Sequence, residues 1–171
     1  MHIVMMGVSG SGKSTIGRLV AAELGCGFIE GDGLHPPANI AKMSAGVPLD
    51  DADRRPWLEL VRERLAEVGR EEGDSVVACS ALRKMYRDTL RAAGDVVFVH
   101  LEAAPERIQH RLEQRSDHFM PAALLGSQLA AMEPLDSTET GFTVSTVGAP
   151  IEVAARILVM LRELPGPTGR S

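Results

Sequence analysis

The rest of this chain is arranged around the stretch GVSGSGKST at residues 7–15. This stretch follows the apolar run HIVMM at residues 2–6, which has the length of a buried strand, and it precedes residues 16–24, whose apolar positions recur at helical spacing. Glycines at this junction let the backbone turn tightly and point successive N–H groups inward, toward a bound phosphate. The order of strand, glycine-rich loop and helix therefore predicts a site for a nucleoside triphosphate.

Each position of the loop has an expected task. Lys13 is long enough to reach the outer phosphates, the Ser14 hydroxyl suits a Mg²⁺ ion, and the following helix adds the positive end of its dipole. We expect the nucleotide to contact Gly7, Ser9, Gly10, Ser11, Gly12, Lys13, Ser14 and Thr15.

Length and composition indicate one globular domain. The chain has 171 residues, of which 44% are hydrophobic and 24% charged, and this is enough to bury a core without disulfides. We expect a single domain over residues 1–164, followed by a disordered tail, PGPTGRS, at residues 165–171.

Charge and cysteine content narrow the class of protein. Lys and Arg number 18 against 23 Asp and Glu, so the net charge of −5 argues against a nucleic-acid binder. Cys26 and Cys79 have no CxxC partner, which favours free thiols in a reducing compartment. No apolar run approaches 18 residues and no leader-like segment opens the chain, so we expect a cytoplasmic protein that does not associate with membranes.

Apolar runs alternate with helical patterns along the rest of the chain. Strands are expected at residues 28–32, 75–80, 95–101 and 142–146, and helices at 38–44, 52–69, 81–92, 105–115, 121–132 and 151–164. Asp50 or Asp51 is expected to cap the long helix, whose apolar stripe is Leu58, Val61, Leu65 and Val68. This alternation predicts an α/β fold with a parallel sheet covered by helices on both faces.

Polar residues follow the expected strands, where ligands collect in an open parallel sheet. Asp32 could accept the proton of an attacking hydroxyl or hold a metal-bound water, although an Asp before Gly33 is also a common turn former. His35, placed before two prolines, is by itself more typical of a loop than of a catalytic base. Ser80, Arg83 and Glu102 complete this set of polar residues.

Arg111 and Arg115 lie four residues apart and lead into the polar stretch SDHFMP. A guanidinium suits both stacking on a base and bidentate contact with phosphate. We therefore expect a lid at about residues 112–130 that brings an arginine to the transferring phosphoryl group and excludes water. The chain contains no NKxD motif for guanine and no strand ending in DxxG, so a small-molecule kinase fits better than a switch GTPase or a motor ATPase.

Three long, ordered stretches carry a family resemblance. They are GDGLHPPANIAKMSAGVPLDDADRRPWL at residues 31–58, ACSALRKMYRDTLR at 78–91 and RLEQRSDHFMPAALLGSQLAAMEPL at 111–135. Over about residues 1–162 the chain resembles the gluconokinases, which are P-loop sugar-acid kinases related to shikimate kinase. The resemblance implies a three-layer fold with a five-stranded parallel sheet, a substrate-binding segment at about residues 33–70, and a lid. It also implies MgATP-dependent phosphorylation of D-gluconate at its 6-hydroxyl, in a protein that is often a homodimer.

The resemblance assigns roles residue by residue. It gives Asp32 the 6-hydroxyl, Arg111 the adenine and Arg115 the phosphates, so that Lys13, Asp32 and Arg115 form the catalytic set. The residues implied for gluconate are Asp32, His35, Lys42, Arg54, Arg83, Tyr86 and Arg87. His118 is a motif position in the expected lid that we group with the substrate site, without a physical role.

Two alternatives to gluconate phosphorylation stay open at the level of sequence. Shikimate is also a hydroxylated carboxylate, so charge alone does not separate a gluconate kinase from a kinase for shikimate, a nucleoside monophosphate or another sugar acid. An ATP-sensing module without chemistry is the second alternative. It is disfavoured because such a protein would be expected to lose Asp32 or the lid arginines, which this sequence keeps.

Overall fold

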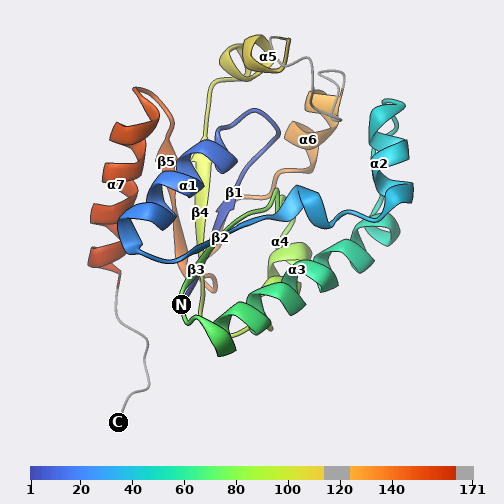
Figure 1. Cartoon of the computed structure of the whole chain (residues 1–171). Helices are drawn as coiled ribbons and strands as arrows, with labels where there is room; N and C mark the ends of the chain where they lie inside the picture. The colour runs from blue at the N-terminus through green and yellow to red at the C-terminus, as the bar shows by residue number, and fades with distance from the viewer. Residues whose placement is uncertain (114–123, 165–171) are drawn as a thin grey trace.

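The sheet is the element to which the other parts attach. A computed structural model describes residues 1–113 and 124–164 (Figure 1). Its strands are β1 (His2–Met6), β2 (Gly27–Glu30), β3 (Ser75–Ala78), β4 (Val96–Glu102) and β5 (Gly141–Ser145). Within the described residues they form one five-stranded parallel sheet in the order β2-β3-β1-β4-β5, which confirms the predicted α/β fold.

Helices cover both faces of this sheet. Figure 1 shows α1 (Lys13–Leu24) and α7 (Pro150–Glu163) on one face and α3 (Asp51–Glu71) and α4 (Lys84–Arg91) on the other. The short elements lie toward the carboxyl ends of the strands: the 3₁₀ turn η1 (Gly31–Leu34), α2 (Pro37–Ser44), α5 (Pro105–Glu113) and α6 (Leu125–Ala131). This edge of the sheet therefore carries most of the irregular structure, as an open parallel sheet requires of its ligand-binding side.

Side-chain alternation along β1 builds the two halves of the core. Val4 and Met6 pack with residues of α3 and α4, whereas Ile3 and Met5 pack with residues of α1 and α7. All four side chains are buried, because β1 is the central strand and is covered on both faces.

Helix α3 forms where its cap and apolar stripe predict. The Asp50 side chain accepts a hydrogen bond from the Asp53 backbone N–H at 2.7 Å, and the Asp53 side chain accepts one from the Asp50 N–H at 3.1 Å. This capping box satisfies two backbone donors at the start of the helix. The stripe Leu58, Val61, Leu65 and Val68 is buried against the sheet, as predicted.

Two predicted boundaries differ from the structure at the functional edge. β2 ends at Glu30, so Asp32 lies in η1 and not at the end of the strand. The helix expected at residues 81–92 begins only at Lys84, because Ala81 adopts a left-handed conformation with a φ of 43°. Residues 80–83 are instead a connecting loop at the carboxyl end of β3.

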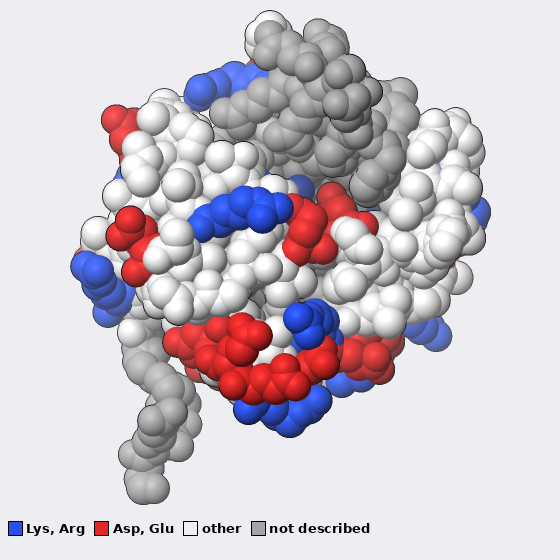
Figure 2. Space-filling view, in the orientation of Figure 1, with Lys and Arg blue, Asp and Glu red and all other residues white. Residues whose placement is uncertain are grey.

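The surface shown in Figure 2 mixes acidic and basic side chains, and acidic side chains gather along its lower edge over the C-terminal end of α3. Within the residues that the structure describes, no helix combines the length and apolar character needed to cross a membrane. Both cysteines are free thiols. The predicted tail at residues 165–171 and most of the predicted lid fall outside the described residues.

Candidate active site

The loop between β1 and α1 forms an open cradle of backbone donors. Gly7, Gly10 and Gly12 have φ angles of 143°, 81° and 103°, a region that favours glycine. Gly12 is the N-cap of α1, no side chain caps the helix, and its first turn contains no acidic residue. The N-terminus of α1 is therefore arranged to meet an anion.

Polar side chains of the loop also indicate an anionic ligand. The Ser11 hydroxyl is fully buried, and among the described residues its oxygen has no hydrogen-bond partner. A Cβ atom at position 7 would lie 2.9 Å from that oxygen, so only glycine leaves this space open. Lys13 is 8% exposed and its ammonium donates to the Val8 carbonyl at 3.0 Å, which holds the charge across the loop. A buried hydroxyl, free loop space and a fixed ammonium fit an oxygen-rich phosphate chain.

The cradle also fits a Mg²⁺ ion carried by a nucleotide. Ser14 lies in the first turn of α1 and is half-buried, and a hydroxyl is a hard oxygen ligand of the kind Mg²⁺ accepts. The described residues contain no group of three His, Cys, Asp or Glu side chains that could hold a metal by themselves.

A pocket joins the phosphate loop to the segment after β2. It brings together four predicted site residues that are far apart in sequence: Lys13, Asp32, His35 and Arg54. The other lining residues are Ser9, Met43, Leu49, Trp57, Ser80 and Gln128. An ammonium, a carboxylate, an imidazole and a guanidinium thus meet at the carboxyl edge of the sheet.

Trp57 of α3 holds the turn that carries Asp32. Its indole N–H donates to the Gly31 carbonyl at 2.8 Å, and its ring stacks on His35 with centroids 4.0 Å apart and planes 15° apart. A Cβ atom at Gly31 would lie 2.4 Å from the Ala78 carbonyl oxygen, so glycine lets η1 pack directly on β3. Asp32 is consequently placed by a turn that contacts both α3 and β3.

His35 is neutral in this environment. Burial lowers its pKa from 6.5 to about 4, with Asp32 raising the pKa and Arg54 lowering it by smaller amounts. Its Nδ1 lies 3.2 Å from the amide nitrogen of Asn39. A neutral imidazole suits a hydroxyl group of a ligand better than a carboxylate.

The predicted cations of the substrate segment are held by carboxylates and by an aromatic ring. Arg54 donates to the Leu49 carbonyl and lies over the Tyr86 ring, 5.5 Å from its centroid. Asp51 accepts hydrogen bonds from Arg83, at 3.1 and 3.3 Å, and from the Tyr86 hydroxyl. This network ties the start of α3 to the start of α4.

Lys42 lies farther from the pocket. It is exposed on α2 and pairs with Asp53 at 2.8 Å, while Asn39 of the same helix donates to the Asp53 carbonyl at 2.9 Å. Lys42, Arg83 and Tyr86 are not among the residues that line the pocket.

Arg87 has a different role from the one predicted. Its side chain is fully buried and pairs with Glu139 at 2.5 and 3.0 Å. Its remaining N–H groups donate to the carbonyls of Ala81, Leu82, Glu133 and Pro134. Because these protein acceptors use all five guanidinium N–H groups, Arg87 supports the loops beside the site and is not among the residues that line the pocket.

The structure says nothing of three predicted side chains. Arg115 and His118 lie outside the described residues, and Arg111 belongs to α5 but its side chain is not described. Their roles remain predictions.

Four lining residues were not singled out from the sequence: Met43, Leu49, Trp57 and Gln128. Trp57 follows Arg54 by three residues, and this helical spacing could have placed both on the face of α3 that meets the site. Gln128 accepts a hydrogen bond from the Ser9 backbone N–H at 2.6 Å, a contact over 119 residues that no local pattern predicts.

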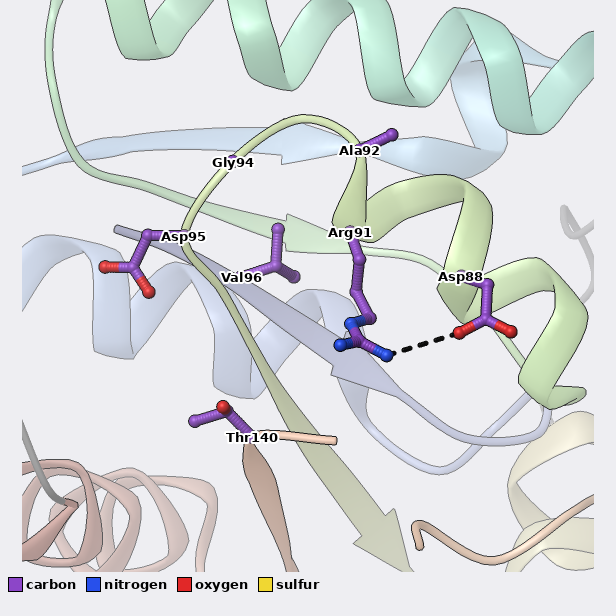
Figure 3. A pocket seen from close by; sticks show the side chains of 7 residues that line it. All are labelled: Asp88, Arg91, Ala92, Gly94, Asp95, Val96 and Thr140. Carbon is purple, nitrogen blue, oxygen red and sulfur yellow. Dashed lines mark hydrogen bonds and ion pairs between the residues drawn. The ribbon is translucent and has the colours of Figure 1, made fainter. Parts of the chain in front are cut away.

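A larger, open hollow of about 510 Å³ lies at the opposite edge of the sheet. Figure 3 shows Arg91, Asp88, Asp95 and Thr140 around it, with Arg91 already paired to Asp88 at 3.3 Å. Because it borders the start of β4 and the residue before β5, this hollow is remote from the phosphate loop, and we assign the active site to the carboxyl edge.

Comparisons with known proteins agree with this geometry. A family model described as shikimate kinase matches residues 9–160. A gluconokinase of Gluconobacter oxydans is 48% identical over 146 residues, which cover 84% of this chain and 81% of the relative.

Solved structures are similar over nearly the whole chain. A gluconokinase from Sinorhizobium meliloti has 43% identity and a TM-score of 0.81, over 95% of this chain and 93% of that one. An unliganded sugar kinase from Janibacter has 44% identity and a TM-score of 0.89, over 94% of both chains. These relatives, together with the phosphate cradle and the pocket beside it, show that the chain belongs to the gluconokinase family, within the wider group of kinases that the shikimate kinase model describes.

Proposed function

We propose that this protein transfers the γ-phosphoryl group of ATP to the 6-hydroxyl of D-gluconate and releases ADP and 6-phospho-D-gluconate. The observation that carries the proposal is the pocket in which Asp32 and Arg54 lie beside Lys13 of the phosphate loop. In an enzyme of a kinase family, this combination offers a base, a cation for a carboxylate and a cation for phosphate at one site. The gluconokinase relatives supply the identity of the acceptor.

The proposed reaction is an in-line displacement. The 6-oxygen of gluconate attacks the γ-phosphorus, a new P–O bond forms, and the bond to the ADP oxygen breaks. Asp32 orients the hydroxyl and takes its proton, while Lys13 and the amides of the loop stabilise the charge on the phosphate oxygens. From the family resemblance we keep Arg111 at the adenine and Arg115 at the phosphates.

Gluconate offers one carboxylate and a row of hydroxyl groups. We assign the carboxylate to the cationic side of the site, where Arg54 and Arg83 are already oriented by Tyr86 and Asp51. We assign hydroxyl groups to neutral His35, because its low pKa removes the charge that a carboxylate partner would need. Lys42 and His118 stay in the proposal as further contacts.

We propose Ser14 as the side-chain ligand of Mg²⁺. When bound with the nucleotide, the cation would neutralise part of the negative charge of the phosphates. The loop amides and Lys13 would then balance the remaining charge.

The first experiment measures ADP release from MgATP by the purified protein. D-gluconate, shikimate, D-glucose, AMP and no acceptor are run side by side, with Lys13→Ala as the inactive variant and Lys84→Ala, a half-exposed surface lysine, as its control. Turnover with gluconate alone, lost in Lys13→Ala and kept in Lys84→Ala, is expected. Turnover only with another acceptor would overturn the substrate, and ATP binding without turnover would favour a sensing role.

We further propose a homodimer in the cytoplasm. The two free cysteines support a reducing compartment, and the dimer rests on the family resemblance. Sedimentation of the purified protein at micromolar concentration tests the assembly, and a monomer would contradict it.

A further inference from the structure

Helix α6 touches both halves of the active site. Figure 1 shows α6 between α5 and α2 at the carboxyl ends of the strands. Leu125 packs with Val8 of the phosphate loop, whereas the preceding Leu124 packs with Met43 and Leu49 of the acceptor segment. The helix is therefore placed by the nucleotide side and the acceptor side together.

Gln128 lies on the same face of α6 as Leu125, three residues farther along. It is 6% exposed, lines the pocket that holds Lys13 and Asp32, and accepts the Ser9 backbone N–H at 2.6 Å. Two successive loop residues, Val8 and Ser9, are thus held by one face of the helix.

The contact with Ser9 fixes which way the carboxamide faces. A backbone N–H is a donor, so the oxygen of the side chain must meet it, and the two N–H donors of the NH₂ group then stand at the other corner of the planar amide. The carboxamide thus belongs to a pocket whose lining also includes the charged or polar side chains of Lys13, Asp32, His35 and Arg54.

We propose that Gln128 is a catalytic residue that donates from its amide nitrogen to an oxygen of the transferring phosphoryl group, while its oxygen holds the Ser9 amide. This inference rests on the proposed kinase reaction and deepens it. A donor prepositioned where charge shifts during transfer lowers the barrier without the cost of reorganising water. The carboxamide adds no net charge, so it does not compete with Asp32 for the proton.

The test compares Gln128→Leu and Gln128→Glu with wild type. Leu removes both the acceptor and the donors, whereas Glu keeps an oxygen for the Ser9 N–H, loses the donors and adds a negative charge. We expect kcat to fall by roughly 10²-fold in both variants, the range seen when one such donor is removed. Leu129→Ala, at an exposed position of the same helix, is the matched control and should keep its kcat.

Nucleotide binding separates this role from simple support of the loop. A contact with the γ-phosphoryl group should make Gln128→Leu lose at least several-fold more affinity for a non-hydrolysable ATP analogue than for ADP, because both nucleotides share the loop that Ser9 belongs to. Equal losses for both nucleotides would show that Gln128 only supports the loop, and unchanged binding with unchanged kcat would exclude any contact. Either result overturns the proposal.

Two controls separate loss of contact from unfolding and from a wrong choice of acceptor. Thermal melting of each variant shows whether α6 still packs, and Gln128→Glu serves if Leu unfolds the protein. Because the ADP and analogue titrations need no acceptor, they report on Gln128 even if gluconate is not the substrate, whereas a wild type that is inactive with gluconate counts against the proposed function alone.

Discussion

At the scale of single residues, the chemistry depends on where Asp32 sits. It lies in a 3₁₀ turn that is fixed to α3 through Trp57 and packed on β3 through Gly31. Its carboxylate lines the pocket from a turn that is held on both sides, which suits the base that we propose it to be.

Asp32→Asn should lower kcat by roughly 10²- to 10⁴-fold, since an amide cannot accept the proton of the acceptor. The affinity for ATP should change little, because the phosphate cradle is built by other residues. Initial rates and nucleotide titrations measure the two effects separately. A selective loss of ATP binding with an intact kcat would instead place Asp32 at the metal.

His35 should make the stability of the fold sensitive to acid. Its pKa in the folded protein is about 4 against 6.5 for the ordinary side chain, because burial disfavours the charged form. Between these two values the unfolded chain binds a proton that the folded protein does not, so stability is complete above about pH 6.5 and falls as the pH drops toward 4.

His35→Gln should therefore flatten the dependence of unfolding free energy on pH in this window, whatever its effect at pH 7. Urea unfolding at several pH values measures the slope for both proteins. Burial also lowers the pKa of His2 and His100, and the difference between wild type and variant cancels their common contribution. Identical slopes would show that His35 is not the responsible group.

At the scale of elements, α3 organises the acceptor side. Its first turns supply Asp51, Asp53, Arg54 and Trp57, which contact α4, α2 and η1. One capped helix therefore sets the mutual positions of three substrate-side elements.

Trp57→Phe keeps an aromatic ring for His35 and removes the N–H donor to Gly31. A buried carbonyl left without its donor should cost about 1–2 kcal/mol of stability. We also expect the KM for gluconate to rise more than the KM for ATP, because η1 belongs to the acceptor side. Urea unfolding and steady-state kinetics test both; a variant that is equally stable with unchanged KM values would contradict the role given to Trp57.

The Arg87–Glu139 pair fixes α4 to the loop before β5. Both side chains are buried from solvent, and removal of one partner leaves an uncompensated charge. Arg87→Met should destabilise the fold by about 3–5 kcal/mol, and Arg87→Met combined with Glu139→Leu should recover much of that loss. Chemical unfolding of the two variants decides, and a single variant as stable as wild type would show that the pair contributes little.

At the scale of the whole molecule, the proposed reaction brings a nucleotide, Mg²⁺ and an acceptor together at one edge of the sheet. The described residues offer no cluster that would keep a metal without the nucleotide. EDTA should therefore abolish turnover, and added Mg²⁺ should restore it, while the melting temperature of the nucleotide-free protein stays the same. A drop in melting temperature with EDTA alone would reveal a resident structural metal.

Much of this arrangement could be predicted from local sequence. The phosphate loop and the apolar stripe of α3 are local patterns with a direct physical meaning. The alternation of apolar strands with amphipathic helices then favours a parallel sheet with helices on both faces, because this arrangement buries the apolar faces of both. Asp32 was found because it follows such a pattern, whereas His35 and Arg54 were assigned to the site by the family resemblance. The structure places all three in one pocket with Lys13.

Contacts between distant segments were decided only by the tertiary structure. Arg87 has the same sequence character as its basic neighbours, and its burial follows from the loops around Glu133 and Glu139 that close over it. Gln128 lies 119 residues from Ser9 in the sequence, so no local sequence pattern predicts the hydrogen bond between them. The sequence by itself determined the strand, loop and helix that hold phosphate, because those rest on local backbone geometry; the fold decided which polar side chains face the ligand, because that depends on which surfaces pack together.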